Sequence, residues 1–238
     1  MFCTWFLFLA VALCASNTGL SALVTCRSNQ MTSLRDSMTS AWKISQREGV
    51  NGSVSCSLWC LREKLCVSFL YNDVTHDCHL FAVVHKVADM TSSSVGYRYY
   101  DTCRAAGYYG ASCTADGECR LTKTRCFHDR CRCQPGYSFD AHQAKCVTSC
   151  SSYGSEFEAI PEYFIDSNNE ESISGIDTAS CLLRCRQATS YVCRTADVRI
   201  SPSPACSTAS VTKNDVPASD WKRLTTWATA HYQRHCRV

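Results

Sequence analysis

The chain opens with an unbroken apolar run over residues 6–13, and small residues follow it up to Ala22. The run is too short to cross a bilayer, and it lacks the polar alternation of a half-buried strand. Its length is that of a signal-peptide core, although no Lys or Arg precedes it. We therefore predict a signal peptide over residues 1–22, cleaved between Ala15 and Ala22, and a secreted, extracellular protein.

Two later segments have the composition of a short helix. Residues 55–63 and 179–187 contain no Gly or Pro, and Asp177 or Thr178 can cap the second helix. Each helix holds two cysteines one turn apart, so both sulfurs face the surface on which the helix packs. Strand-like stretches follow the helices, at residues 67–71 and 191–198. One helix stapled to a small antiparallel sheet is the expected shape of each region.

The cysteines repeat one rhythm near the two ends of the chain. Six cysteines in steps of 30, 4, 6, 12 and 25 are followed later by six in steps of 31, 4, 8, 13 and 30. Tyr99 and Tyr232 each stand four residues before the last cysteine of their set, and Arg104 and Arg237 follow it. We interpret this as an internal repeat of about eighty residues. With six more cysteines between the repeats, we expect modules over residues 23–104, 105–149 and 150–238.

Cysteine usage also bears on the compartment. Of the 20 cysteines, Cys3 and Cys14 leave with the signal peptide, so an even number remains. Their spacing suits disulfides better than metals, because Cys131 and Cys133 lack a second pair at zinc-finger spacing. With every remaining cysteine paired within its module, no spare thiol predicts a covalent dimer, and the oligomeric state stays open.

Charge and hydropathy exclude two classes of partner. The net charge is +3, and none of the three modules carries a concentrated basic excess, so no nucleic acid is expected. No later stretch is long and apolar enough to span a bilayer, and the chain stops two residues after Cys236. We therefore expect no membrane anchor and a soluble mature protein.

Motifs around the cysteines carry a resemblance to a known family. In the first repeat, Phe69-x-Tyr71-Asn72 leads from the Cys-x-x-x-Cys helix to Cys78-His79-Leu80. In the second, Val192-Cys193-Arg194-Thr195 and Pro204-Ala205-Cys206 stand at the matching places. Both repeats resemble the PAN/apple domain, whose fold is a helix cradled by a curled antiparallel sheet. The resemblance implies an α+β protein of small disulfide-rich modules.

The resemblance also implies a pairing, among the fifteen that each set of six allows. A bridge that closes such a module would stabilise it by roughly 4 kcal/mol in the chain-entropy model. For the first repeat the implied pairs are Cys26–Cys103, Cys56–Cys78 and Cys60–Cys66. For the last repeat they are Cys150–Cys236, Cys181–Cys206 and Cys185–Cys193.

The middle segment, mostly β and loop, resembles an EGF-like or invertebrate EB-type module. The resemblance rests on its opening, Cys113 to Cys119, and on the run from Cys131 to Tyr137. Residues 105–112 contain no carboxylate, so no calcium site is expected there. The resemblance implies the pairs Cys113–Cys126, Cys119–Cys131 and Cys133–Cys146.

Candidate catalytic residues have simpler interpretations, so we expect no enzyme and no cofactor. No serine lies in a Gly-x-Ser-x-Gly elbow. Acidic residues form a polar stretch that is interpreted as a solvated loop or edge: Glu156, Glu158, Glu162, Glu170 and Glu171. The histidines beside cysteines are interpreted as surface residues: His76, His79, His231 and His235.

Two features point to the surface of a secreted glycoprotein. Asn51-Gly52-Ser53 is a sequon in a turn-like run, so Asn51 is expected to carry a glycan. The Ser-Pro run over residues 201–204 could carry O-linked sugar.

Aromatic and basic residues interleave near the end of the chain, where an acidic glycan could bind. Trp59, Trp221 and Tyr232 are expected in the core, and the candidate ligand residues are Arg223, Arg234, Arg237 and Trp227.

The sequence therefore favours a secreted adhesion or recognition protein that binds extracellular protein or carbohydrate. Two alternatives stay open: a structural component of an extracellular matrix, and a defence protein whose middle module inhibits a protease. Fold alone does not name the partner.

Overall fold

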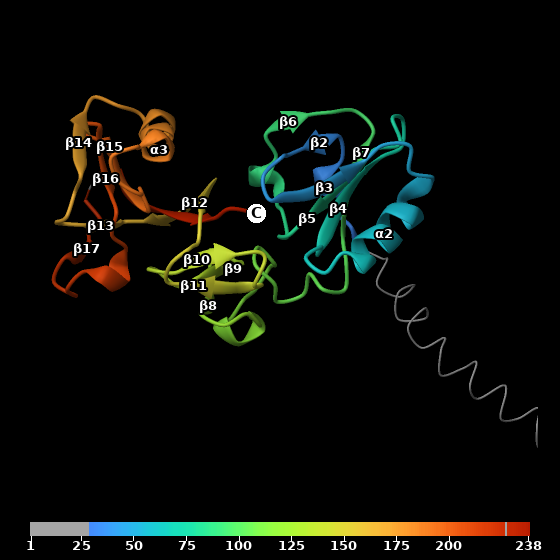
Figure 1. Cartoon of the computed structure of the whole chain (residues 1–238), viewed down its shortest axis with the longest axis horizontal. Coiled ribbons are helices and arrows are strands. Elements are labelled where there is room, and N and C mark those ends of the chain that lie inside the picture. Colours follow the sequence, from blue (N-terminus) through green and yellow to red (C-terminus); the bar gives the residue numbers. More distant parts are fainter. Residues whose placement is uncertain (1–28, 227) are drawn as a thin grey trace, which may run out of the picture. The chain divides into compact units, whose positions relative to one another are not determined.

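A computed structural model describes residues 29–226 and 228–238. The signal peptide, Cys26 with its expected bridge to Cys103, and Trp227 lie outside the described residues. The chain divides into two compact units between Ala111 and Ser112 (Figure 1). Within the described part, no helix is long and apolar enough to cross a membrane.

The first unit is a helix on a five-stranded antiparallel sheet. The strands follow the order β1-β7-β4-β5-β3, and α2 packs against β4 and β5 (Figure 1). The bounds are β1 Asn29–Gln30, β3 Lys43–Arg47, α2 Gly52–Arg62, β4 Ser68–Asn72, β5 Cys78–Phe81 and β7 Tyr97–Asp101. Short elements complete the unit: η1 Thr32–Leu34, β2 Ser37–Met38, η2 Val87–Asp89 and β6 Ser92–Ser93.

Both faces of this sheet are covered. The central strand β4 is buried along its whole length, with Phe69 and Tyr71 on the helix side and Leu70 on the other. On the far side, Leu70 packs with Tyr97 and Tyr99. Because successive residues of a strand point to opposite faces, one buried strand supplies two cores.

Residues 105–111 pack onto the first unit, although the sequence assigned them to the middle module. Ala105 and Ala111 are buried with Val67 and Val84, and the Val84 amide donates to the carbonyl of Tyr109 at 3.0 Å. Gly110 allows this close approach, because a Cβ at this position would clash with the Val84 carbonyl. The expected module boundaries therefore stay predictions, and the compact units divide at a different place.

The second unit contains a sheet of the same design. Its strand order is β12-β18-β15-β16-β14, also antiparallel, and α3 packs against β15 and β16 (Figure 1). The bounds are β12 Tyr153–Pro161, β14 Glu171–Ser174, α3 Thr178–Gln187, β15 Thr195–Ser201, β16 Ala205–Ala209 and β18 Ala228–Cys236. In both units the helix follows the second strand of the sheet in chain order, so the repeat extends to topology.

Local expectations for the helices hold in outline. Asp177 caps α3, since its carboxylate accepts a hydrogen bond from the Ser180 amide at 2.7 Å. The first helix begins three residues earlier than expected, at Gly52. The strand expected over residues 191–198 begins only at Thr195, because the preceding residues form the loop closed by the Cys185–Cys193 bridge.

The middle segment of the second unit consists of two hairpins, formed by β8 with β9 and by β10 with β11. Their bounds are β8 Thr124–Phe127, β9 Arg130–Cys133, β10 Ser138–Asp140 and β11 Lys145–Val147, after η3 Asp116–Glu118. A small side sheet pairs β13 Tyr163–Ile165 with β17 Trp221–Arg223, and η4 Lys213–Asp215 precedes β17.

The second hairpin is bonded to the polar face of β18. The Gly136 amide donates to Oε1 of Gln233 at 2.7 Å, and the Phe139 amide donates to Nδ1 of His235 at 2.9 Å. The Ser138 hydroxyl donates to the carbonyl of Arg234 at 2.7 Å. Backbone donors of the hairpin thus meet side-chain acceptors of the sheet, and the middle segment becomes part of the second unit.

Burial corrects two expectations from the sequence. His79, His231 and His235 are buried, and of the four histidines expected at the surface only His76 is exposed. Glu158, expected in a solvated stretch, is also buried, although its strand β12 is indeed a sheet edge. The sequence pattern does not reveal the burial of His235 and Glu158, because the middle segment covers them through Phe139 and Arg132.

His235 is held in its neutral form. Its Nδ1 accepts the Phe139 amide proton and therefore cannot carry a proton of its own. Burial lowers the pKa of His235 to about 3, and repulsion from Arg132 acts in the same direction. The Glu158 carboxylate lies 3.7 Å from Nε2, but that carboxylate is already paired with Arg132 at 3.3 Å.

We expect acid to destabilise the second unit through His235. The unfolded residue takes up a proton below its ordinary pKa of 6.5, and the folded ring does not until about pH 3. The contribution of His235 to the free energy of unfolding is therefore fully present above pH 6.5. Below that pH it falls by up to roughly 1.4 kcal/mol per pH unit. Urea unfolding at a series of pH values, with disulfides intact, measures this slope.

The control separates this ring from the other histidines. His235→Asn keeps an acceptor for the Phe139 amide and should flatten the slope, whereas His142→Asn, at an exposed position, should leave it unchanged. A slope that persists in His235→Asn would assign the acid sensitivity to other groups.

Candidate functional site

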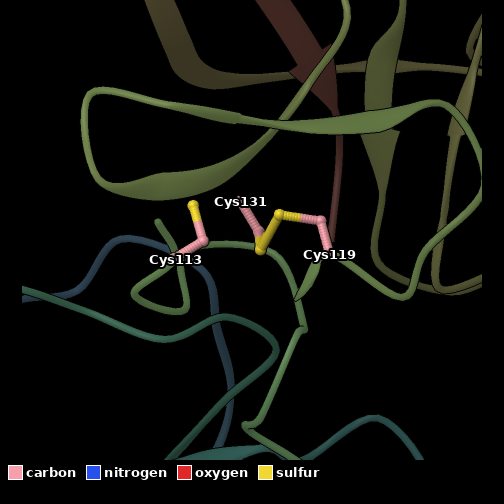
Figure 2. Close-up of side chains that lie close together, drawn as sticks. All are labelled: Cys113, Cys119 and Cys131. Carbon is pink, nitrogen blue, oxygen red and sulfur yellow. A yellow bond between two sulfur atoms is a disulfide. The ribbon is translucent and has the colours of Figure 1, made fainter. Parts of the chain in front are cut away.

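Cysteine sulfurs gather in the middle segment in a way that resembles a metal site. The Sγ atoms of Cys113, Cys119 and Cys131 lie within 4.8 Å of one another (Figure 2). Figure 2 shows, however, that Cys119 and Cys131 form a disulfide. Cys113 is bonded to Cys126, which the figure does not draw. Sulfurs in disulfides are not thiolates, so this cluster lacks the ligands that zinc requires.

Among the described residues, six further pairs of cysteines are bridged within their own sets. Cys103 is disulfide-bonded as well. The structure brings together Cys56–Cys78, Cys60–Cys66, Cys133–Cys146, Cys150–Cys236, Cys181–Cys206 and Cys185–Cys193.

A polar groove of about 450 Å³ lies in the second unit, where the loop between β9 and β10 faces the side sheet and η4. We call it the aromatic groove, because three rings line it together with two cations, two carboxamides and one carboxylate. The rings are Tyr137, Tyr163 and Trp221, and the cations are Arg125 and Lys213.

Strand pairing orients two of these rings. In the register of β13 and β17, Ile165 lies opposite Trp221, so Tyr163 is its diagonal neighbour on the same face. The rings of Tyr163 and Trp221 stack at 5.0 Å with an interplanar angle of 11°. The rings of Trp221 and the buried His231 meet edge to face with centroids 4.9 Å apart, and His231 in turn is hydrogen-bonded to Asp197 at 2.8 Å. The sheet therefore supports the stacked rings of Tyr163 and Trp221 through His231.

Cations lie over the aromatic rings in and beside the groove. Nζ of Lys213 is 5.8 Å from the centroid of Trp221, and Nζ of Lys123 is 5.7 Å from that of Tyr137. The Arg125 guanidinium lies 4.7 Å from the ring centroid of Phe127, and its buried Nε has no hydrogen-bond partner among the described residues. Such cation–π contacts hold the charges in place without neutralising them.

The groove depends on a close approach at Gly136. The Asn214 side chain donates to the Gly136 carbonyl at 2.8 Å, and a Cβ at Gly136 would lie 2.5 Å from Cγ of Asn214. The backbone of Gly136 also has a φ of +91°, which an L side chain rarely adopts. Glycine at this position lets the β9–β10 loop meet η4.

Comparison with protein families identifies part of the chain. A scan against family models matches residues 26–102 to the PAN domain. The first unit carries a PAN domain. A search of curated proteins finds no match. The second cysteine-rich region is not assigned to a family, and what it shares with the PAN domain is the strand order, the helix and its two cysteine bridges.

The PAN domain presents Asn51 to solvent. Asn51 directly precedes α2, is exposed, and makes no side-chain hydrogen bond to the helix start. A glycan at this position stays a prediction. As expected, Trp59 packs against the core of the PAN domain and Tyr232 against that of the second unit, but Trp221 lines the aromatic groove instead.

The arginines proposed as ligand contacts do not come together in this groove. Arg223 donates twice to Oε2 of Glu162, at 2.9 and 2.6 Å. Arg237 is exposed, and its amide donates to the Ser152 carbonyl. The fourth candidate, Trp227, lies outside the described residues. The groove residues were missed because they come from separate stretches, and the Pro-Gly-Tyr turn after Cys133 was their one visible signal.

Arg234 is half-buried and bonds to the backbone rather than facing solvent. It donates to the carbonyl of Gly154 at 2.6 Å and to those of Cys193 and Cys185 at 3.2 and 3.5 Å. Burial lowers the pKa of Arg234, and repulsion from Arg186 acts in the same direction. In the PAN domain, Arg104 does the same for α2, donating to the carbonyl of Leu61 at 2.6 Å.

We therefore expect Arg234→Ala to lower the free energy of unfolding by about 2 kcal/mol, because charged hydrogen bonds to three carbonyls are lost. Urea unfolding with intact disulfides measures the change. Arg237→Ala removes an exposed guanidinium nearby and should leave stability within about 0.5 kcal/mol of the parent. Equal stability of the two variants would contradict the bracing role.

Proposed function

We propose that this protein is a secreted, non-enzymatic recognition protein that binds extracellular protein or carbohydrate ligands. The PAN domain is the observation that carries the proposal, since domains of this family are extracellular modules that bind such ligands. The many disulfides are consistent with an extracellular location.

We extend the proposal to a second PAN-like module over residues 150–238, with an EGF-like or EB-type module before it. The shared strand order supports this, because five strands and one helix can be connected in many other ways. The equivalent bridges support it as well, since Cys56–Cys78 and Cys181–Cys206 both join the helix to the fourth strand in the sheet order.

A binding role also fits the chemistry of the polar groups. The described cysteines are held in disulfides and offer no nucleophile. The His231 imidazole, which is hydrogen-bonded to Asp197, is fully buried, and Trp221 packs against it edge to face. A reacting group needs access to substrate, which this imidazole lacks.

The test is binding by the whole secreted chain. We expect saturable binding to at least one member of an array of glycans and extracellular-matrix proteins, measured with the purified, oxidised protein. Reduced and alkylated protein is the control, and it should lose the binding because the recognition surface depends on the disulfides.

Two outcomes would overturn the proposal. Concentration-dependent self-association without any saturable ligand would favour a structural matrix component. Stoichiometric inhibition of a protease in the same array would favour the inhibitor alternative.

A further inference from the structure

We infer that the aromatic groove of the second unit binds an acidic oligosaccharide, with sugar rings on its aromatic faces and the anionic groups on Arg125, Lys123 and Lys213. This inference rests on the proposed function, because it names the ligand class and the site of one recognition surface.

The first argument is the state of the cations. Along the described chain, no ion pair involves Lys123, Arg125 or Lys213. By contrast, the two cations on the same strand as Trp221 are neutralised: Lys222 lies 2.8 Å from Asp166 and Arg223 lies 2.6 Å from Glu162. Unneutralised positive charge is therefore concentrated on the groove side of this region.

The second argument is the single carboxylate in the groove. Asp116 lines the groove, and its Oδ1 already accepts the Cys126 amide at 2.8 Å. Arg125 and Lys213 line the groove and Lys123 lies over the ring of Tyr137, so the cations outnumber the one engaged carboxylate and an anionic ligand is favoured. The Arg125 guanidinium lines the groove, and guanidinium groups suit planar carboxylate and sulfate oxygens.

The third argument is the combination of flat rings with amide groups. Aromatic faces pack against the C–H faces of sugar rings, and the carboxamides of Gln134 and Asn214 can bond hydroxyls. A volume of about 450 Å³ is too large for a lone anion and falls within the range of small-ligand sites. Since the whole chain has a net charge of only +3, an extended polyphosphate such as nucleic acid fits less well.

Rigidity is the fourth argument. Tyr163 and Trp221 are stacked, Trp221 is braced by His231, and Gly136 is tied to Asn214 and Gln233. A preformed site loses little conformational entropy when a ligand binds, so a few charge-assisted contacts suffice for measurable affinity.

The experiment uses the full secreted chain and three hexasaccharide probes. A heparin-derived probe carries sulfate and carboxylate, a hyaluronan probe carries carboxylate alone, and chitohexaose is neutral. We expect calorimetry to show binding of an acidic probe that weakens as salt is raised, and no binding of the neutral probe. Binding of both acidic probes means that carboxylate suffices, and binding of the heparin probe alone assigns the site to sulfate.

Matched variants locate the site. Lys213→Ala and Arg125→Ala should each weaken binding roughly tenfold, the loss of one charge-assisted hydrogen bond. Lys222→Ala and Arg120→Ala remove exposed cations from the same strand region and the same module, and should bind like the parent. Thermal unfolding of each variant shows that the fold is retained.

A second readout does not depend on these cations. Trp221 lines the groove, so ligand binding should change tryptophan fluorescence, and Trp221→Phe should remove that change while it keeps an aromatic ring. Equal weakening by the control variants, or unchanged binding in Lys213→Ala and Arg125→Ala, would overturn the groove assignment and leave the proposed function standing. Absence of binding to all three probes would overturn the ligand class, and the proposed function would then depend on protein ligands.

Discussion

Two disulfides hold each helix, one to the sheet beneath it and one to the loop that follows it, from cysteines that stand one helical turn apart. In the PAN domain the sulfurs of Cys56 and Cys60 are fully buried, and in the second unit those of Cys181 and Cys185 are as well. One bridge of each pair spans 22 or 25 residues and crosses to the sheet, and the other spans 6 or 8 and fixes the loop after the helix. A module of this size has a thin core, so these bridges compensate by restricting the unfolded chain.

This constraint is also the part of the fold that the sequence predicts best. Cysteine spacing reveals the repeat, and the absence of Gly and Pro between the paired cysteines reveals the helices. Tyrosine and arginine spacing are less informative. Tyr99 and Tyr232 stand at equal distances from the last cysteine, yet Tyr99 packs on the face away from α2 and Tyr232 on the face toward α3. The register pairs Phe69 with Tyr100 and Ala196 with Tyr232, so Tyr100 is the structural equivalent of Tyr232.

A shift of one residue in the closing strand explains this mismatch and its consequences. Because side chains alternate along a strand, the shift exchanges the two faces relative to the cysteine. The arginine after the last cysteine braces the helix in the PAN domain, as Arg104, whereas Arg234 within β18 does so in the second unit. Spacing alone cannot reveal such a shift, since it depends on how each strand pairs with its neighbours.

The far face of the closing strand then determines what covers each sheet. In the PAN domain this face presents Tyr97 and Tyr99, which pack with Leu34 from the unit's own η1. In the second unit it presents Gln233 and His235, whose side chains accept backbone hydrogen bonds from the middle hairpin. An apolar face is covered by apolar loops, and a polar face needs partners that can bond it.

The aromatic groove depends on the hydrogen bonds between the middle hairpin and the polar face of β18. Docking of the hairpin on β18 carries the Gly136 turn to η4 and so brings Tyr137 to the groove that Tyr163 and Trp221 also line. These residues are far apart in sequence, and no local pattern connects them. The sequence predicts Trp221 in the core. Its place in the groove depends on its stacking on Tyr163 and its contact with His231, which exist only after the side sheet has formed. The same polar contacts that attach the middle segment to the sheet therefore also build the surface that we assign to an acidic ligand.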